Sequence, residues 1–232
     1  MFNLNEKQSS RIIEIQNLSY FLKKSFESLK MLNNTQEKSL LEIFTKVEYD
    51  IKEIRANSSD FEQEHLESFI SNLHGEELTV LDEMERLQRY SLLLTTFAFF
   101  ESKLKELCNE IERDIDFRVK LNDLNKNKGD LFKYWTFLVK IFGVNGVRLE
   151  KSFNVICQHK KIRNAISHSD GVVPKKDSNF LKDIKFIKIV EFEDNYLVSL
   201  QKDYLEYLIN EIELFTDDLL EEIVKKYTEI LN

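Results

Sequence analysis

Apolar residues recur at three- and four-residue spacing along most of this chain, which is the pattern of helices that bury one face. The spacing predicts a helix over about residues 5–32, a break at "NNTQE" (33–37) and a second helix that ends at "ANSSDFE" (56–62). A third helix should end at Gly75. From there a long helix should run to about residue 113. Its middle is apolar on nearly every face, so it should lie at the centre of the core.

The pattern changes further along the chain. A loop rich in Asn, Lys and Gly (121–130) leads to a helix that ends at "GVNG", and a helix over about 147–169 follows, with Gly171 as its left-handed cap. Residues 184–200 alternate between apolar and polar and turn at "EDN", which predicts a β-hairpin. A last amphipathic helix should begin near Asp203.

These elements predict an all-α fold, a helical bundle with one small β-hairpin near the carboxyl terminus. The chain holds one Pro and five Gly in 232 residues, which fits long helices better than a turn-rich β protein. The break at Gly75 predicts two parts. Residues 1–75 would form an amino-terminal, coiled-coil-like helical region, and residues 76–232 a helical domain.

Composition narrows the class of function. A net charge of −8 and a pI of about 5.2 argue against a protein that coats nucleic acid by bulk charge, although a local basic cleft is still compatible with them. Cys108 and Cys157 lie in apolar helical contexts, as expected for free thiols in a reducing cytosol. The amino terminus is polar, and the most apolar run (90–100) is too short to span a bilayer. We therefore expect a cytoplasmic protein with no signal peptide and no membrane segment.

One stretch carries candidate chemistry: "HKKIRNAISHSDG", residues 159–171, at the end of a predicted helix. At about 100° per residue, Val155, Ile162 and Ala165 should face the core together with Ile166. The opposite flank carries Phe153, Ile156 and Cys157 in the first half of the helix. It becomes polar toward the helix end, through His159, Lys160, Arg163, Asn164, Ser167 and His168. Such a change in character predicts the wall of a cleft or an interface.

The residue types on that flank suit attack on a phosphodiester. An imidazole in the last turn, that of His168, can exchange a proton near neutrality, and the Arg163 guanidinium can hold a phosphate. Asn164 stacks on His168 at i and i+4. Four lysines add local positive charge: Lys160, Lys161, Lys175 and Lys176. The ordinary alternative is that basic residues gather in a final turn because of the helix dipole alone.

The string "KKIRNAISHSDG" resembles the signature of the HEPN superfamily, in which an Arg, a polar residue, three further positions and a His close a helix. Arg163, Asn164 and His168 carry that match. Upstream, "TTFAFFESKLKELC" resembles an earlier helix of that fold, in which an acidic residue, here Glu101, follows an aromatic pair. The resemblance covers about residues 76–230.

The resemblance implies a homodimer through the motif-bearing helices, and a metal-independent endoribonuclease acting as a bacterial toxin or abortive-infection defence effector, restrained by an antitoxin or another regulatory protein. It implies that His168 moves the proton, that Arg163 stabilises charge on phosphorus, and that Asn164 orients His168 or the phosphate. Glu101 would hold Arg163 or His168. Residues expected to contact RNA are His159, Lys160, Lys161, Ser167, Lys175 and Lys176. One subgroup has a Tyr two positions after the His, where this chain has Asp170, so that form of control is not expected here.

Two other hypotheses about function remain open. The same cleft could hold RNA or a protein without catalysis, or the chain could be a helical scaffold whose amino-terminal region mediates assembly. We expect no metal or cofactor, because the chain lacks a Gly-rich phosphate loop and a CxxC pair. His159 and His168 are also not at metal-ligand spacing.

Overall fold

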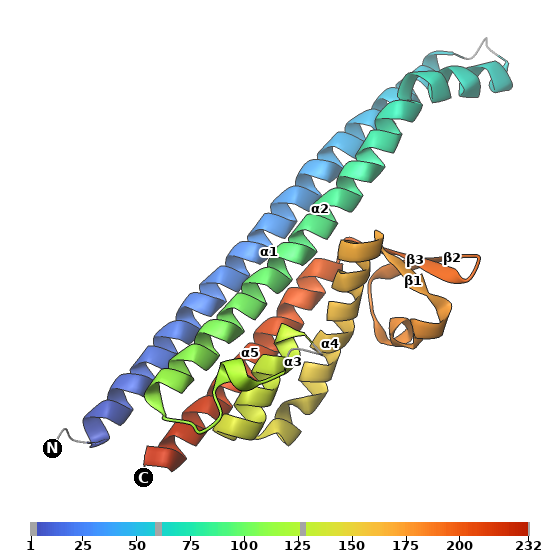
Figure 1. Cartoon of the computed structure of the whole chain (residues 1–232). Coiled ribbons are helices and arrows are strands. Elements are labelled where there is room, and N and C mark those ends of the chain that lie inside the picture. The colour runs from blue at the N-terminus through green and yellow to red at the C-terminus, as the bar shows by residue number, and fades with distance from the viewer. Residues whose placement is uncertain (1–3, 59–61, 126–128, 232) are drawn as a thin grey trace.

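Two long antiparallel helices dominate the computed structural model, which describes residues 4–58, 62–125 and 129–231 (Figure 1). Helix α1 spans Leu4–Asn57 and α2 spans Gln63–Asp114. Neither predicted interruption, at "NNTQE" or at Gly75, breaks a helix. The turn predicted around residues 56–62 includes residues 59–61, which lie outside the described residues.

A buried ion pair explains why α1 continues through "NNTQE". Glu37 is only 8% exposed, and its carboxylate accepts two hydrogen bonds from the Arg89 guanidinium on α2, at 2.7 and 2.8 Å. Arg89 also donates to the carbonyl of Leu200, at 3.0 Å. The predicted break therefore lies inside the helix and supplies a buried polar partner for α2.

Helix α5 (Tyr204–Leu231) packs antiparallel to the first half of α1. Lys30 pairs with Glu213 and Lys23 with Asp217. At about 1.5 Å per residue, the 54 residues of α1 extend roughly 80 Å and the 28 residues of α5 roughly 40 Å, so α5 covers only about half of α1.

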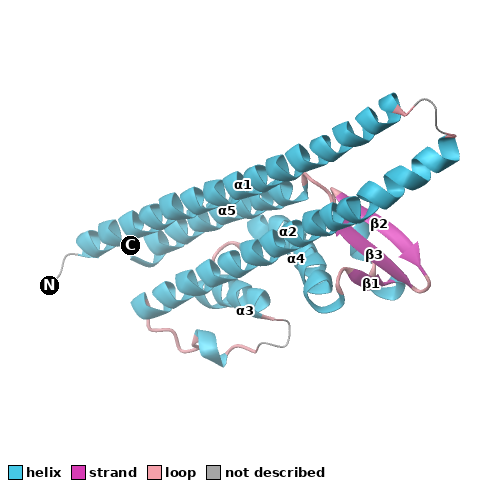
Figure 2. Cartoon of the chain, turned by 90° about the horizontal axis from the view of Figure 1, so that it is seen from above, coloured by secondary structure: helices cyan, strands magenta, loops and turns pink. Residues whose placement is uncertain are grey.

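The uncovered part is here called the distal hairpin: residues 38–57 of α1 and 63–88 of α2. The rest of the molecule is the proximal body. In Figures 1 and 2, α1 and α2 continue together past the other elements into this hairpin. The predicted boundary after residue 75 falls inside it, within continuous α2.

Short elements complete the proximal body. Helix α3 (Asp130–Thr136) continues as a π-helical segment, η2 (Phe137–Phe142), and α4 spans Gly146–Ser169. The loop predicted over 121–130 contains a 3-10 turn, η1 (Leu121–Asp123), and includes residues 126–128, which lie outside the described residues. The Trp135 ring stacks on Phe153 with centroids 4.2 Å apart, joining α3 to α4 in the core.

A three-stranded antiparallel sheet lies beside the end of α4, with strand order β1-β3-β2. The predicted hairpin is confirmed as β2 (Ile187–Phe192) and β3 (Asn195–Leu200). Strand β1 (Val172–Pro174) was not predicted, because three residues are too few to show alternation. Two 3-10 segments, η3 (Lys175–Asp177) and η4 (Asn179–Asp183), join β1 to β2. The prediction of a mainly helical fold with a small sheet near the carboxyl terminus is confirmed.

No helix within the described residues combines the length and apolar character that a bilayer crossing requires. The apolar run at residues 90–100 forms part of α2, and Leu93 and Phe97 in it are fully buried in the proximal body, as the sequence predicted. Cys108 and Cys157 are free thiols, and burial raises the pKa of Cys157 to about 11.

Candidate functional site at the carboxyl end of α4

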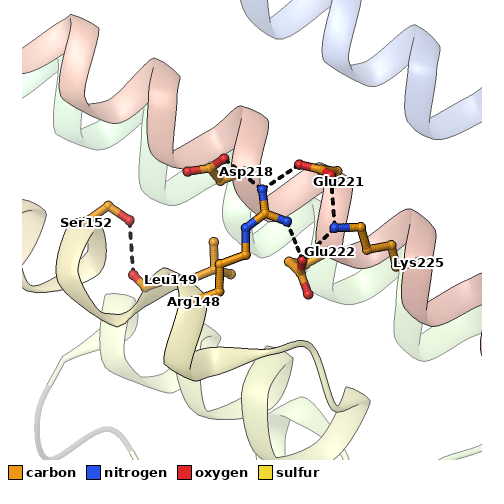
Figure 3. Close-up of polar contacts among 7 residues, drawn as sticks. All are labelled: Arg148, Leu149, Ser152, Asp218, Glu221, Glu222 and Lys225. Atoms are coloured by element: carbon orange, nitrogen blue, oxygen red, sulfur yellow. Dashed lines mark hydrogen bonds and ion pairs between the residues drawn. The ribbon is translucent and has the colours of Figure 1, made fainter.

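The amino-terminal end of α4 is fixed by a charged cluster on α5 (Figure 3). The Arg148 guanidinium donates to Glu222 at 2.6 Å and to Glu221 at 2.7 Å, and Lys225 pairs with both carboxylates. Hydrogen bonds from Arg148 and then Lys225 lower the pKa of Glu221 to about 2. The cluster anchors α4 on a helix that itself packs against α1.

The carboxyl end of α4 is fixed by a different set of contacts. Asp170 and Gly171 both adopt positive φ, 51° and 87°, and the Gly171 amide donates to the Ala165 carbonyl at 3.0 Å. A Cβ on Gly171 would lie 2.6 Å from the Val198 carbonyl oxygen, so only glycine fits there without a shift. The predicted left-handed turn is present, but the residue that caps α4 is Asp170, and Gly171 follows it.

A contact with α2 holds the same turn from the other side. The Asp170 carboxylate forms an ion pair with Arg86, whose guanidinium lies over the Tyr90 ring. The Tyr90 hydroxyl donates to the Val198 carbonyl on β3, at 3.1 Å. Asp170 thus positions the motif-bearing turn. Arg86 was missed at the sequence level, because nothing in the local pattern links two residues 84 positions apart.

The buried face of α4 differs from the prediction. Its buried residues are Leu149, Phe153, Ile156, His159, Ile162 and Ile166. Phe153 and Ile156 lie in the core, although they were assigned to the flank opposite it, and Val155 and Ala165 are only half-buried. Because α4 packs on α5 and α2 along its length and on β1 at its end, the buried face rotates along the helix instead of following one line.

His159 is therefore a core residue, and its assignment to the polar flank that would contact RNA was wrong. It is 1% exposed, and its Nδ1 lies 2.9 Å from the Tyr204 hydroxyl. Burial lowers its pKa to about 4, so the ring is neutral near neutral pH.

Arg163 and Asn164 do lie together. Arg163 Nη1 donates to the Asn164 side-chain oxygen at 3.2 Å, and both residues are half-buried. Asn164 thus orients Arg163, whereas the sequence analysis expected Asn164 to orient His168 or the phosphate. Arg163 Nε is buried and has no hydrogen-bond partner within the described residues.

Arg163 also differs from the other arginines that are not fully exposed. Arg86 and Arg89 each pair with two carboxylates. Across the described ranges 4–58, 62–125 and 129–231, no carboxylate lies within ion-pair distance of Arg163. A half-buried guanidinium without a counterion is costly, so this position is suited to accept an anionic group from outside the chain.

His168 and Ser167 are exposed on the last turn of α4. In the described part of the chain no hydrogen bond or ion pair joins His168 to Arg163. Glu101 pairs with Lys160, so it holds neither Arg163 nor His168. The predicted residues therefore share one helix end without forming one contact network.

The lysines predicted to contact RNA also do not gather at one place. Lys161 and Asn164 line an open hollow of about 470 Å³ between the end of α4 and the segment from β1 to η4, and Lys161 lies over the Phe180 ring at 5.0 Å. Lys175 turns away to Glu191 and the Tyr196 ring. Lys176 is exposed. The positive charge that remains available near Arg163 comes mainly from Lys161.

In comparisons with known proteins, no family model, no curated protein and no solved structure matches the chain. Inferences about function therefore rest on the residues and geometry described above.

Proposed function

We propose that this protein is a metal-independent endoribonuclease of the HEPN type that uses the carboxyl end of α4. The observation that carries the proposal is Arg163: a half-buried guanidinium, oriented by Asn164, with no carboxylate partner among the described residues. Of the anions that a guanidinium binds by paired hydrogen bonds, the phosphodiester of RNA lies beside a ribose 2′-hydroxyl, whose proton the exposed imidazole about one and a half turns later can accept.

The chemistry follows from these two groups. His168 accepts the proton of a ribose 2′-hydroxyl, whose oxygen forms a bond to the adjacent phosphorus. Arg163 stabilises the negative charge that builds on the phosphoryl oxygens. The bond from phosphorus to the 5′ oxygen breaks, and the His168 imidazolium returns the proton to that oxygen. The products are a 2′,3′-cyclic phosphate and a 5′-hydroxyl.

The substrate class is RNA with a flexible backbone, since in-line attack by the 2′-hydroxyl requires a rotation that a regular duplex resists. Lys161 lines the hollow beside Asn164 and can contact the RNA backbone, whereas Lys160 is paired with Glu101. In this proposal two copies associate through their motif-bearing helices, and the cell uses the activity as a toxin or an anti-phage effector held in check by an antitoxin.

A second candidate is a non-catalytic module that holds RNA or a protein partner on the same surface. The absence of a contact between Arg163 and His168 within the described residues favours it, because a binding site needs no such alignment. The net charge of −8 favours it over a ribonuclease with broad RNA affinity.

The test is an RNA cleavage assay in excess EDTA with the wild-type protein, Arg163→Ala and His168→Ala. We expect wild-type cleavage to persist in EDTA and each variant to lose about 10²–10⁴-fold in rate, the range for losing a general acid–base or a transition-state charge partner. Product ends are read by their resistance to ligation before removal of the cyclic phosphate.

Two matched variants control for loss of charge alone. Arg118→Ala removes an exposed arginine, and His65→Ala removes an exposed histidine in the distal hairpin. Both should cleave at the wild-type rate. RNA binding that is lost in Arg163→Ala, without product from any protein, would establish the binding module instead. Equal cleavage by all five proteins would show that Arg163 and His168 do not form the catalytic site and would remove the ribonuclease proposal.

A further inference from the structure

The distal hairpin carries an apolar stripe that no part of the described chain covers. Five α2 residues form it, with exposed fractions from 38% to 58%: Phe69, Leu73, Val80, Met84 and Leu87. At about 100° per residue they fall within an arc of roughly 60°, and they extend roughly 27 Å along the helix. Large exposed apolar side chains are ordinary singly, but a continuous row of them marks an interaction surface.

This stripe is distinct from the seam that joins the two helices. Ile70 and Leu81 of α2 are buried at 6% and 4%, as is Val47 of α1 at 2%, and they close the hairpin. Arg86 and Tyr90 face the sheet and the end of α4 instead. The stripe therefore lies on a third face of α2, and neither α1 nor the proximal body needs it for packing.

The charge around the stripe is mainly negative. Residues 69–87, which span the stripe, hold five acidic side chains and one basic side chain, Arg86, which pairs with Glu83 and Asp170. Glu76 and Glu77 flank the stripe on α2 within about one helical turn, and both are exposed. The occupant of the stripe must therefore bring apolar groups flanked by positive charge.

A second copy of the chain does not meet that requirement. An antiparallel copy centred on the stripe, near residue 78, would place its own Glu76 and Glu77 within about one turn of the first pair, and a parallel copy in register would stack them directly. Like charges opposed in this way oppose association, and the one Lys or Arg of residues 69–87, Arg86, is already paired with Glu83 and Asp170.

We propose that the stripe binds a basic amphipathic helix of a partner protein, with apolar residues at three- and four-residue spacing and Lys or Arg on both flanks. Such a helix would lie along α2 and turn the two-helix hairpin into a three-helix bundle. The site lies outside the proposed RNA site and does not depend on it.

A designed peptide tests the proposal on the full-length protein. The probe is an 18-residue, fluorescein-labelled peptide of Leu and Lys, with leucines at helical 3–4 spacing. One counter-probe carries Glu in place of each Lys, and a second scrambles the Leu–Lys order. Fluorescence anisotropy at about physiological salt gives each dissociation constant, and circular dichroism checks that each protein is folded.

We expect the amphipathic Leu–Lys peptide to bind at least tenfold more tightly than either counter-probe. The double variant Leu73→Ser, Val80→Ser should weaken binding at least tenfold, and Glu76→Lys severalfold. The matched control is Leu214→Ser, which changes a 63%-exposed leucine on α5 and should bind as wild type does. Both stripe positions are exposed, so the variants should fold.

Three results would overturn the proposal. Equal affinity of wild type and the stripe variant would place the peptide elsewhere, and equal affinity for the scrambled peptide would reduce the effect to bulk charge. Self-association of the wild type in sedimentation, abolished by the stripe variant, would make a second copy the occupant.

Discussion

The proximal body and the distal hairpin are built from the same two helices, yet they bury side chains to different degrees. On α2, Leu93 and Phe97 of the proximal body are fully buried, whereas Leu73 and Val80 of the distal hairpin are more than half exposed. The difference follows from their neighbours. Within the described residues, the proximal part of α2 contacts α1, α3, α4, α5 and β3, whereas the distal part packs along α1 and meets the turn after α4 only at its base, through Arg86.

An apolar residue on a helix therefore does not by itself specify a core position. Each helix of a two-helix hairpin can bury only one seam, so apolar residues beyond that seam remain exposed until another element arrives. In the proximal body that element belongs to the chain. In the distal hairpin we infer that it belongs to another protein.

The largest expected effect comes from the same substitution, Leu to Ala, made in each of the two regions of α2. Leu93→Ala should lower the free energy of unfolding by about 2–5 kcal/mol, because it removes a fully buried side chain and leaves a cavity. Leu73→Ala should change it by less than about 0.5 kcal/mol, because the side chain is 53% exposed. Urea denaturation followed by circular dichroism measures both.

A large loss in Leu73→Ala would mean that the stripe already packs against something in the isolated protein. The proposal of an unoccupied surface would then fail. A small loss in Leu93→Ala would contradict the assignment of the core itself.

The second prediction concerns pH and a polar group in the core of the proximal body. His159 has a folded-state pKa lowered from 6.5 to about 4 by burial, so the native state favours the neutral ring. The unfolded chain then takes up a proton first as the pH falls. The resulting stability is complete above pH 6.5 and is lost between about 6.5 and 4, by an amount on the order of 2–3 kcal/mol.

The measurement compares wild type with His159→Gln, which is neutral at every pH. Carboxylates titrate alike in both proteins, so the difference between their stability curves isolates His159. The variant curve should be flatter between pH 6.5 and 4. His65→Gln, which replaces an exposed histidine of the distal hairpin, should follow the wild-type curve. Parallel curves for wild type and His159→Gln would contradict the buried neutral state.

The sequence predicted what local patterns control. Spacing and turn chemistry predicted the helical class, the β2–β3 hairpin and the start of α5 near Asp203, and they placed the left-handed turn after α4 to within one residue. Each depends on residues close together in the chain, so the residues that form the element also carry its signal.

The predictions were wrong where a partner far away in the sequence determines the environment of a side chain. Glu37 belongs to the stretch that predicted a helix break, but its ion pair with Arg89, 52 positions away, buries it inside α1. His159 was predicted to belong to a basic cluster, but it lies in the core, where it contacts Tyr204. Of the candidate site, the pairing of Arg163 with Asn164 lies within one helix, whereas the partners of Glu101 and Asp170 lie 59 and 84 positions away.

The smallest effect concerns Gly75, the residue that predicted a break and instead lies inside α2. A Cβ there would meet only the Ser71 hydroxyl oxygen, at 3.7 Å, which is an ordinary contact. Gly75→Ala should therefore stabilise the helix by about 0.5–1 kcal/mol, through the lower backbone entropy of the unfolded chain.

Since α5 does not reach this segment, the gain should appear first as slower amide hydrogen exchange around residues 70–81 and only weakly in global unfolding. Gly171→Ala is the opposing control, because its φ of 87° and the nearby Val198 carbonyl penalise any side chain, and it should destabilise the protein. If Gly75→Ala raised global stability by its full amount, the distal hairpin would unfold together with the proximal body. The two regions would then differ in surface but not in cooperativity, and a partner helix on the stripe would stabilise the whole molecule.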